Sequence, residues 1–164
     1  MVVLRTLCLV VAMAAAGTAG AHVSVQPAEA TAGAYQVLRF GVGHGCDGSA
    51  TRTVRIEIPP GVPAARPQPK PGWTLAVQRA ADGRVTAVTW AGELAADEFD
   101  EFLILMRLPP ELGALPFPAI QGCDGAEAQW IEIAPAGAPR PARPAPAVTL
   151  KPGGAPQPGH DRHH

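Results

Sequence analysis

The sequence has almost no net charge and none of the short motifs that mark common catalytic sites. Its formal net charge is −1 at pH 7, from 13 basic and 14 acidic side chains. This balance gives no case for binding nucleic acid or an anionic membrane surface. It contains no G-x-S-x-G elbow, no H-E-x-x-H helix and no glycine-rich phosphate loop. Catalysis by one of these familiar arrangements is therefore not predicted.

The first residues follow the order of a secretory signal peptide. Arg5 precedes an apolar run at 6–16, and small residues follow up to the A-G-A triplet at 19–21. A basic start, a short apolar segment and an A-x-A site predict cleavage after Ala21, with release into the periplasm or outside the cell. The apolar run is shorter than the about 20 residues of a membrane span, and a retained anchor is the alternative.

Cysteine is scarce. Cleavage would remove Cys8 and leave two cysteines, Cys46 and Cys123. An even number in an exported protein favours a disulfide, with two free thiols as the alternative. A bridge across so long a loop is worth about 4 kcal/mol in the chain-entropy model. The pair is not a C-x-x-C motif, which argues against a thioredoxin-type redox role.

Residues 22–134 have the pattern of one all-β domain. Short runs of β-branched, leucine and aromatic residues are broken by glycine and proline, and no stretch shows a sustained helical period. In the run at 51–58, for example, Val54, Ile56 and Ile58 fall on one face. An antiparallel β-sandwich of the immunoglobulin-like or cupredoxin-like type is predicted. We expect its strands at 22–26, 35–42, 51–58, 73–79, 84–90, 99–108, 115–120 and 128–133.

Three segments are expected to lie outside the strands. The sequence ADGR at 81–84 predicts a tight hairpin turn, because Asp-Gly supplies positive φ angles. The proline-rich segment 61–73 should be an extended loop, since its prolines lack the donors that a central strand needs. Residues 135–164 are dominated by proline, alanine and glycine and predict a disordered tail.

Five histidines survive cleavage. His160, His163 and His164 lie in the tail, where they are either loose ligands for copper, zinc or nickel or a solvated polar end. His22 has a different chemistry, because cleavage after Ala21 would give it a free α-amine. An α-amine has a pKa of about 7.7–8, so a metal displaces its proton near neutral pH. Amine and imidazole could then chelate copper(II), which prefers tetragonal nitrogen and oxygen donors.

A carboxylate could complete such a site. Glu29 lies close in sequence, and Glu132 shares a strand face with Trp130 because the two are two residues apart. Trp130 could cover the site or simply pack in the core, as we expect of Trp73 and Trp90. The acidic group at 97–101 is interpreted as a solvated edge.

Six separated motifs then appear in order: HVSVQPAEATAG, GHGCDGS, PKPGW, VTWAG, DEFDEF and QWIEI. Together they resemble the YcnI-like family of exported bacterial proteins, a domain formerly of unknown function. The resemblance covers about residues 22–134. It implies a cupredoxin-like or immunoglobulin-like sandwich that binds one copper(II) ion.

The resemblance also implies a set of site residues. The family site is a monohistidine brace on the processed N-terminal histidine, which corresponds to His22, with a tryptophan near the metal that corresponds to Trp130. For the carboxylate, Glu29 is the first choice and Glu132 the second. The paired cysteines of some relatives support the disulfide Cys46–Cys123. The short tail departs from relatives that continue into a membrane helix or a further domain.

The sequence thus predicts an exported copper(II) carrier or chaperone in copper acquisition or homeostasis, and not an enzyme. Its expected partners are copper, a copper transporter or another periplasmic copper protein. One rival is a copper-dependent oxidative enzyme, which would need His44 as a second histidine on the ion. The other is a structural sandwich domain that binds a protein partner.

Overall fold

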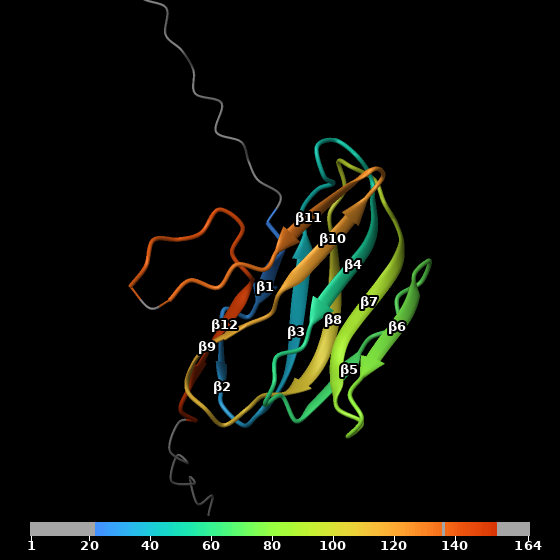
Figure 1. Cartoon of the computed structure of the whole chain (residues 1–164). Coiled ribbons are helices and arrows are strands. Elements are labelled where there is room, and N and C mark those ends of the chain that lie inside the picture. Colours follow the sequence, from blue (N-terminus) through green and yellow to red (C-terminus); the bar gives the residue numbers. More distant parts are fainter. Residues whose placement is uncertain (1–21, 136, 154–164) are drawn as a thin grey trace, which may run out of the picture.

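The computed structural model describes residues 22–135 and 137–153, and every regular element in this part is a β-strand. The strands form three sheets, and the two larger ones are the layers of a sandwich (Figure 1). The all-β, antiparallel sandwich predicted from the sequence is confirmed. In the described ranges, no helix is present that could cross a membrane.

The first sheet has the order β1-β3-β8-β5 and is antiparallel throughout. Its long central pair runs in register from Tyr35 opposite Arg107 to Val42 opposite Asp100. Alternate residues of this pair are buried, as the two-residue period of a strand requires. The strands are β1 (Ser24–Gln26), β3 (Tyr35–Val42), β8 (Asp100–Arg107) and β5 (Ala64–Pro67).

The second sheet has the order β11-β10-β4-β7-β6 and is also antiparallel. Its strands are β11 (Ala126–Trp130), β10 (Ala119–Cys123), β4 (Thr51–Glu57), β7 (Val85–Leu94) and β6 (Thr74–Arg79). The two sheets bury their facing residues in one core. Trp90, Phe40, Phe102 and Phe117 are its largest side chains with less than 2% exposure.

A third, smaller sheet joins the two ends of the domain (Figure 1). Its strands are β2 (Glu29–Thr31), β12 (Ala147–Lys151) and β9 (Gly113–Pro116). β12 lies between the others, parallel to β2 and antiparallel to β9. Val148 and Leu150 point from β12 into the core, where their exposures are 0% and 3%.

The prediction of a disordered tail from residue 135 onward is therefore wrong for β12. The sequence AVTLK at 147–151 alternates apolar and polar residues, and strands on both sides satisfy its backbone. The prediction used the average composition of residues 135–164, and this short strand does not show in that average. Residues 154–164, which include His160, His163 and His164, lie outside the described residues, as does the predicted signal peptide at 1–21.

Two local predictions need correction. The proline-rich segment 61–73 is not all loop, because β5 forms within it as the edge strand of the first sheet, where a missing donor costs little. The predicted hairpin does link β6 and β7, but only Gly83 takes a positive φ, of 83°. The Gly83 amide donates to the Ala80 carbonyl at 2.9 Å, which fits a three-residue loop closed by a glycine bulge.

The predicted disulfide is confirmed. Cys46 and Cys123 are bonded, with Cα atoms 6.0 Å apart, and join the loop after β3 to the end of β10. Beside them lies Gln121, which is fully buried. Its Nε2 donates to the His44 carbonyl at 2.8 Å and to Thr51 Oγ1 at 2.7 Å. The disulfide and this amide fix the loop that carries His44.

Candidate metal centre

His22 is held at one edge of the first sheet. It stands two residues before β1, which is the edge strand of that sheet. Val23 and Val25 are buried, with exposures of 4% and 7%, whereas His22 and Ser24 between them are exposed. The alternation anchors the start of the chain in the core and leaves the His22 side chain outside it.

Trp130 lies against His22. The two ring centroids are 4.9 Å apart, with an interplanar angle of 34°. Trp130 is the last residue of β11, the edge strand of the second sheet, and is 5% exposed. The contact therefore bridges the two layers at one side of the sandwich. We call this side, with His22, β1 and Trp130, the His22 edge.

The indole nitrogen at this edge has no acceptor. Among the described residues, Trp130 Nε1 is a buried donor without a hydrogen-bond partner. Such an unpaired buried donor costs about 1–3 kcal/mol relative to a satisfied one. The Nε1–H of indole is a donor only, so Trp130 can cover a metal site with its ring but cannot bind through a nitrogen lone pair.

A cleft of about 330 Å³ opens beside His22. One side is formed by residues 22–25 and the other by Arg140 and residues 144–147. We call residues 137–146 the wall segment. Sequence reasoning missed it because it lies in the presumed tail, although the strand pattern of AVTLK just after it could have placed it on the domain.

Glu132 fastens the wall segment. Its backbone amide donates to the Arg143 carbonyl at 3.1 Å, and its carbonyl accepts from the Ala145 amide at 2.9 Å. Its carboxylate Oε2 accepts from the Arg143 amide at 2.8 Å. The neighbouring residues Pro144 and Ala145 line the cleft. Glu132 thus lies two residues beyond Trp130 and is bonded to the segment that walls the cleft.

Glu29 lies in different surroundings. It begins β2 in the third sheet, and its Oε1 is 2.6 Å from Lys151 Nζ. Both side chains are more than half exposed, so the ion pair itself adds little stability. A role for Glu29 at His22 would require its carboxylate to leave Lys151.

No larger cluster of ligands forms from side chains. In the part of the chain that the structure describes, no group of three or more His, Cys, Asp or Glu side chains could hold a metal ion. His44 Nδ1 contacts the Gly45 carbonyl at 2.7 Å, and its own carbonyl is held by Gln121. These contacts tie His44 to its loop.

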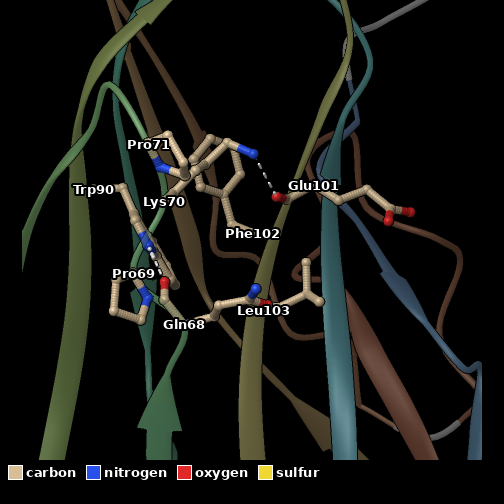
Figure 2. A pocket seen from close by; sticks show the side chains of 8 residues that line it. All are labelled: Gln68, Pro69, Lys70, Pro71, Trp90, Glu101, Phe102 and Leu103. Carbon is tan, nitrogen blue, oxygen red and sulfur yellow. Dashed lines mark hydrogen bonds between the residues drawn. The ribbon is translucent and has the colours of Figure 1, made fainter.

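The opposite edge of the sandwich is closed by residues 68–73, which we call the strap. The strap links β5 of the first sheet to β6 of the second and lines a crevice of about 180 Å³ (Figure 2). Lys70 Nζ lies 2.6 Å from Asp100 Oδ1, donates to the Glu101 carbonyl at 3.2 Å and stands 5.3 Å from the Phe102 ring centroid.

Aromatic packing completes the strap edge. Trp90 Nε1 donates to the Gln68 carbonyl at 3.1 Å, as Figure 2 shows. The ring of Trp73 meets Phe102 edge-on at 4.9 Å and covers Gly92, where a Cβ atom would come within 2.5 Å of the indole. The motifs PKPGW, VTWAG and DEFDEF therefore meet here. Trp73 and Trp90 pack as predicted, and Asp100 is paired rather than simply solvated.

Comparison with known proteins identifies the family. The sequence profile described as "Domain of unknown function (DUF1775)" matches residues 22–150. The chain belongs to this YcnI-like family. The match begins at His22 and extends into β12, so the YcnI-like domain includes the wall segment.

Two relatives support this assignment. The YcnI-like chain is 29% identical over 116 residues to the copper-binding protein CutI of Bacillus subtilis (strain 168). That match covers 68% of the chain and 56% of CutI, so the chain spans about half of the relative's length. A crystal structure of an uncharacterized protein from Nocardia farcinica, described as immunoglobulin-like, matches with a TM-score of 0.70 and 29% identity. It covers 79% of this chain and 97% of that one.

Proposed function

We propose that this YcnI-like protein is exported and binds one copper(II) ion at His22, as a carrier in copper acquisition or homeostasis rather than as an enzyme. The observation that carries the proposal is the contact of His22 with Trp130 at 4.9 Å beside an open cleft. The 29% identity to a copper-binding protein supports the choice of metal.

Two of the proposed copper donors come from one residue. After cleavage at Ala21, His22 offers its α-amine and Nδ1, which can close a chelate on one ion. A third donor is needed, and we propose Glu132, because it is bonded to the segment that walls the cleft. Glu29 is the less favoured candidate, since it is paired with Lys151. Nitrogen and carboxylate oxygen donors together suit copper(II).

Trp130 has a separate task in this proposal. Its buried ring covers one face of the His22 imidazole and limits how the side chain can turn. A bound paramagnetic ion next to the indole should also quench its fluorescence, which provides a local signal of loading.

The proposal is tested by titrating copper(II) into mature protein while following tryptophan fluorescence and electron paramagnetic resonance. Intact mass first establishes whether His22 is residue one. One tight site is expected, and His22→Ala or a glycine added before His22 should weaken it by more than about 100-fold, since direct donors matter more than outer ones. His44→Ala is the matched control and should bind as the wild type does. Tight binding that survives both changes at His22 would refute the brace.

Acidification should release the ion. Protons compete with copper for the amine and the imidazole, so the apparent affinity falls as the pH drops below neutrality. A copper affinity that stays constant from pH 8 to about pH 5 would exclude these two donors.

A further inference from the structure

The first sheet exposes apolar side chains on the side that faces away from the core. Because alternate residues of a strand point to opposite faces, the odd-numbered residues of β3 and β8 lie on this side. Tyr35 and Val37 are 58% and 39% exposed, and Leu103 and Leu105 are partly buried. Figure 2 shows Leu103 leaving β8 on the side opposite Phe102. We call this side of the first sheet the outer face.

The strand register sets the neighbours on the outer face. Leu105 lies between Val37 on β3 and Arg66 on β5. Arg107 follows two residues later on β8, opposite Tyr35. Directly opposite residues on one face of a sheet have Cβ atoms about 4.5–5.5 Å apart. Apolar side chains and guanidinium groups therefore share one surface.

The outer face has a basic end and an acidic end. Arg66 and Arg107 lie toward the end where β8 finishes, whereas Glu101 lies where β8 begins, just after the acidic residues 97–98. Of these charged groups, only Glu101 has an ion pair within residues 22–135 and 137–153, at 3.9 Å from Arg39. Charges of both signs are thus left unpaired, at separate ends of one face.

The second sheet differs on its own solvent side. There Arg55 donates to Glu57 Oε1 at 2.7 Å and to Gln78 Oε1 at 2.9 Å. This arginine is satisfied within the chain, although it also stands on a sheet open to solvent. The unpaired charges of the outer face are therefore not a general property of the surface. A partner that carries the same pattern in reverse would neutralise them.

We infer that the outer face binds the same face of a second copy of this chain, with the strands of the two copies antiparallel. A two-fold axis across the strands brings the basic end of each copy over the acidic end of the other. Arg107 then faces Glu101 of the partner subunit, and the contact occurs twice. Leu103 and Leu105 pack between the two contacts. Sheets that pack face to face in this way lie about 10 Å apart with nearly aligned strands.

Charge decides between the two possible directions. With the strands of the two copies parallel, a two-fold axis would put basic end on basic end and acidic end on acidic end. Like charges that face each other across an interface disfavour association, whereas opposite charges favour it and fix the register. The antiparallel arrangement is therefore the one that the charges of the outer face favour.

The size of the outer face sets the strength of the dimer. Strands about 4.8 Å apart, with residues of one face about 7 Å apart along each strand, give roughly 400–500 Å² per copy. Phe99, which directly precedes β8 and is 75% exposed, adds apolar area at the acidic end. A total of about 1,000 Å² is at the lower limit for a specific interface. We therefore expect a weak dimer, with a dissociation constant of about 10–100 µM.

The inference is tested on mature protein without added metal, so the result does not depend on the proposed copper site. Sedimentation velocity from about 1 µM to about 1 mM should show a monomer that converts into a dimer. Arg107→Glu and Glu101→Arg each oppose like charges at both contacts, and each should weaken the dimer about 100-fold. Arg79→Glu is the control, because Arg79 is exposed on β6 of the other sheet, and should associate as the wild type does.

The double variant gives the sharpest result. Arg107→Glu combined with Glu101→Arg reverses both contacts and should recover most of the lost association. Residues 101 and 107 are about 20 Å apart along one strand, so a pair within one copy cannot explain the recovery. A wild type that stays monomeric up to about 1 mM overturns the inference, and so does a double variant as weak as the single ones. Monomers that instead bind vesicles rich in anionic lipid, and lose this binding with Arg107→Glu, would assign the outer face to a membrane and also overturn it.

Discussion

The two edges of the sandwich differ in how completely side-chain contacts join the two sheets. At the strap edge, an ion pair, an indole hydrogen bond and a cluster of aromatic rings cross between the sheets. At the His22 edge, one ring contact crosses between the sheets, and the indole donor beneath it has no acceptor among the described residues. The strap edge is closed by paired groups, whereas the His22 edge has an indole donor without a partner among the described residues and an open cleft beside it.

The largest expected effect is at the strap edge. Phe102→Ala should lower the free energy of unfolding by about 3–5 kcal/mol, because Phe102 is buried and its ring touches both Trp73 and Trp90. Urea unfolding measures the loss, and Phe102→Leu is the milder companion if the alanine variant does not fold. Folded protein of either variant should keep the copper affinity of the wild type. A parallel loss of copper binding would mean that the two edges are coupled.

The two tryptophans offer a matched comparison. Trp90→Phe leaves the Gln68 carbonyl without its donor, whereas Trp130→Phe removes a donor that has no partner among the described residues. We expect Trp90→Phe to be the more destabilising by about 1–3 kcal/mol, measured by urea unfolding. Conversely, only Trp130→Phe should remove copper-dependent quenching. Equal destabilisation by the two variants would show that the Trp130 donor is satisfied in solution.

A smaller effect is expected at Lys70. Its ion pair with Asp100 is about one-quarter exposed, and screening by solvent limits its value to about 1 kcal/mol. Lys70→Met should cost about that amount in thermal unfolding, and adding Asp100→Asn to it should recover part of the loss. The double-variant cycle isolates the pair. A cost several times larger would mean that the strap depends on this contact more than on its aromatic packing.

The smallest effect on stability is expected at Asp124, which lies just before β11, at the end of that strand away from Trp130. There Arg52 donates hydrogen bonds to Asp124, 2.8 and 2.9 Å long, and also pairs with Glu93. The Arg52 hydrogen bond lowers the pKa of Asp124, and the same bonds raise the pKa of Arg52. The stabilising contribution is therefore full above about pH 4, the ordinary aspartate value, and is lost as the pH falls through the lowered pKa. Asp124→Asn should flatten the acid limb of the stability profile slightly, and an unchanged limb would show that the pair is fully screened.

Much of this fold could be predicted because its strands alternate. The predicted range 35–42 coincides with β3. Those at 51–58 and 73–79 differ from β4 and β6 by one residue at one end, and that at 99–108 differs from β8 by one residue at each end. The strands β2, β5 and β12, which are short or contain proline, were missed. The single strand predicted at 115–120 is also wrong, because this range falls across two strands, β9 and β10. The pairing of the missed strands depends on partners far away in the sequence, which local patterning does not contain.

The site was predictable only in part. The processing signal directs attention to His22, and the family motifs direct it to Trp130. Their contact could not be derived, because it joins the edge strands of two different sheets. The sequence did not point to Arg140. It lies between two prolines, and this composition does not distinguish an ordered wall segment from a disordered tail. The preference for Glu29 over Glu132 followed sequence proximity, whereas the cleft wall is bonded to Glu132.

The parallel pairing of β2 with β12 has a consequence for how the protein is made. β2 pairs only with β12, and His22 meets Trp130 at the end of β11, so both contacts join the start of the domain to its last strands. Such distant contacts form late and make folding slow. The contact of His22 with Trp130 therefore cannot form until almost the whole domain has been made. The cleft beside His22 also needs residues 144–147 for one of its sides, so a chain truncated before them would lack it.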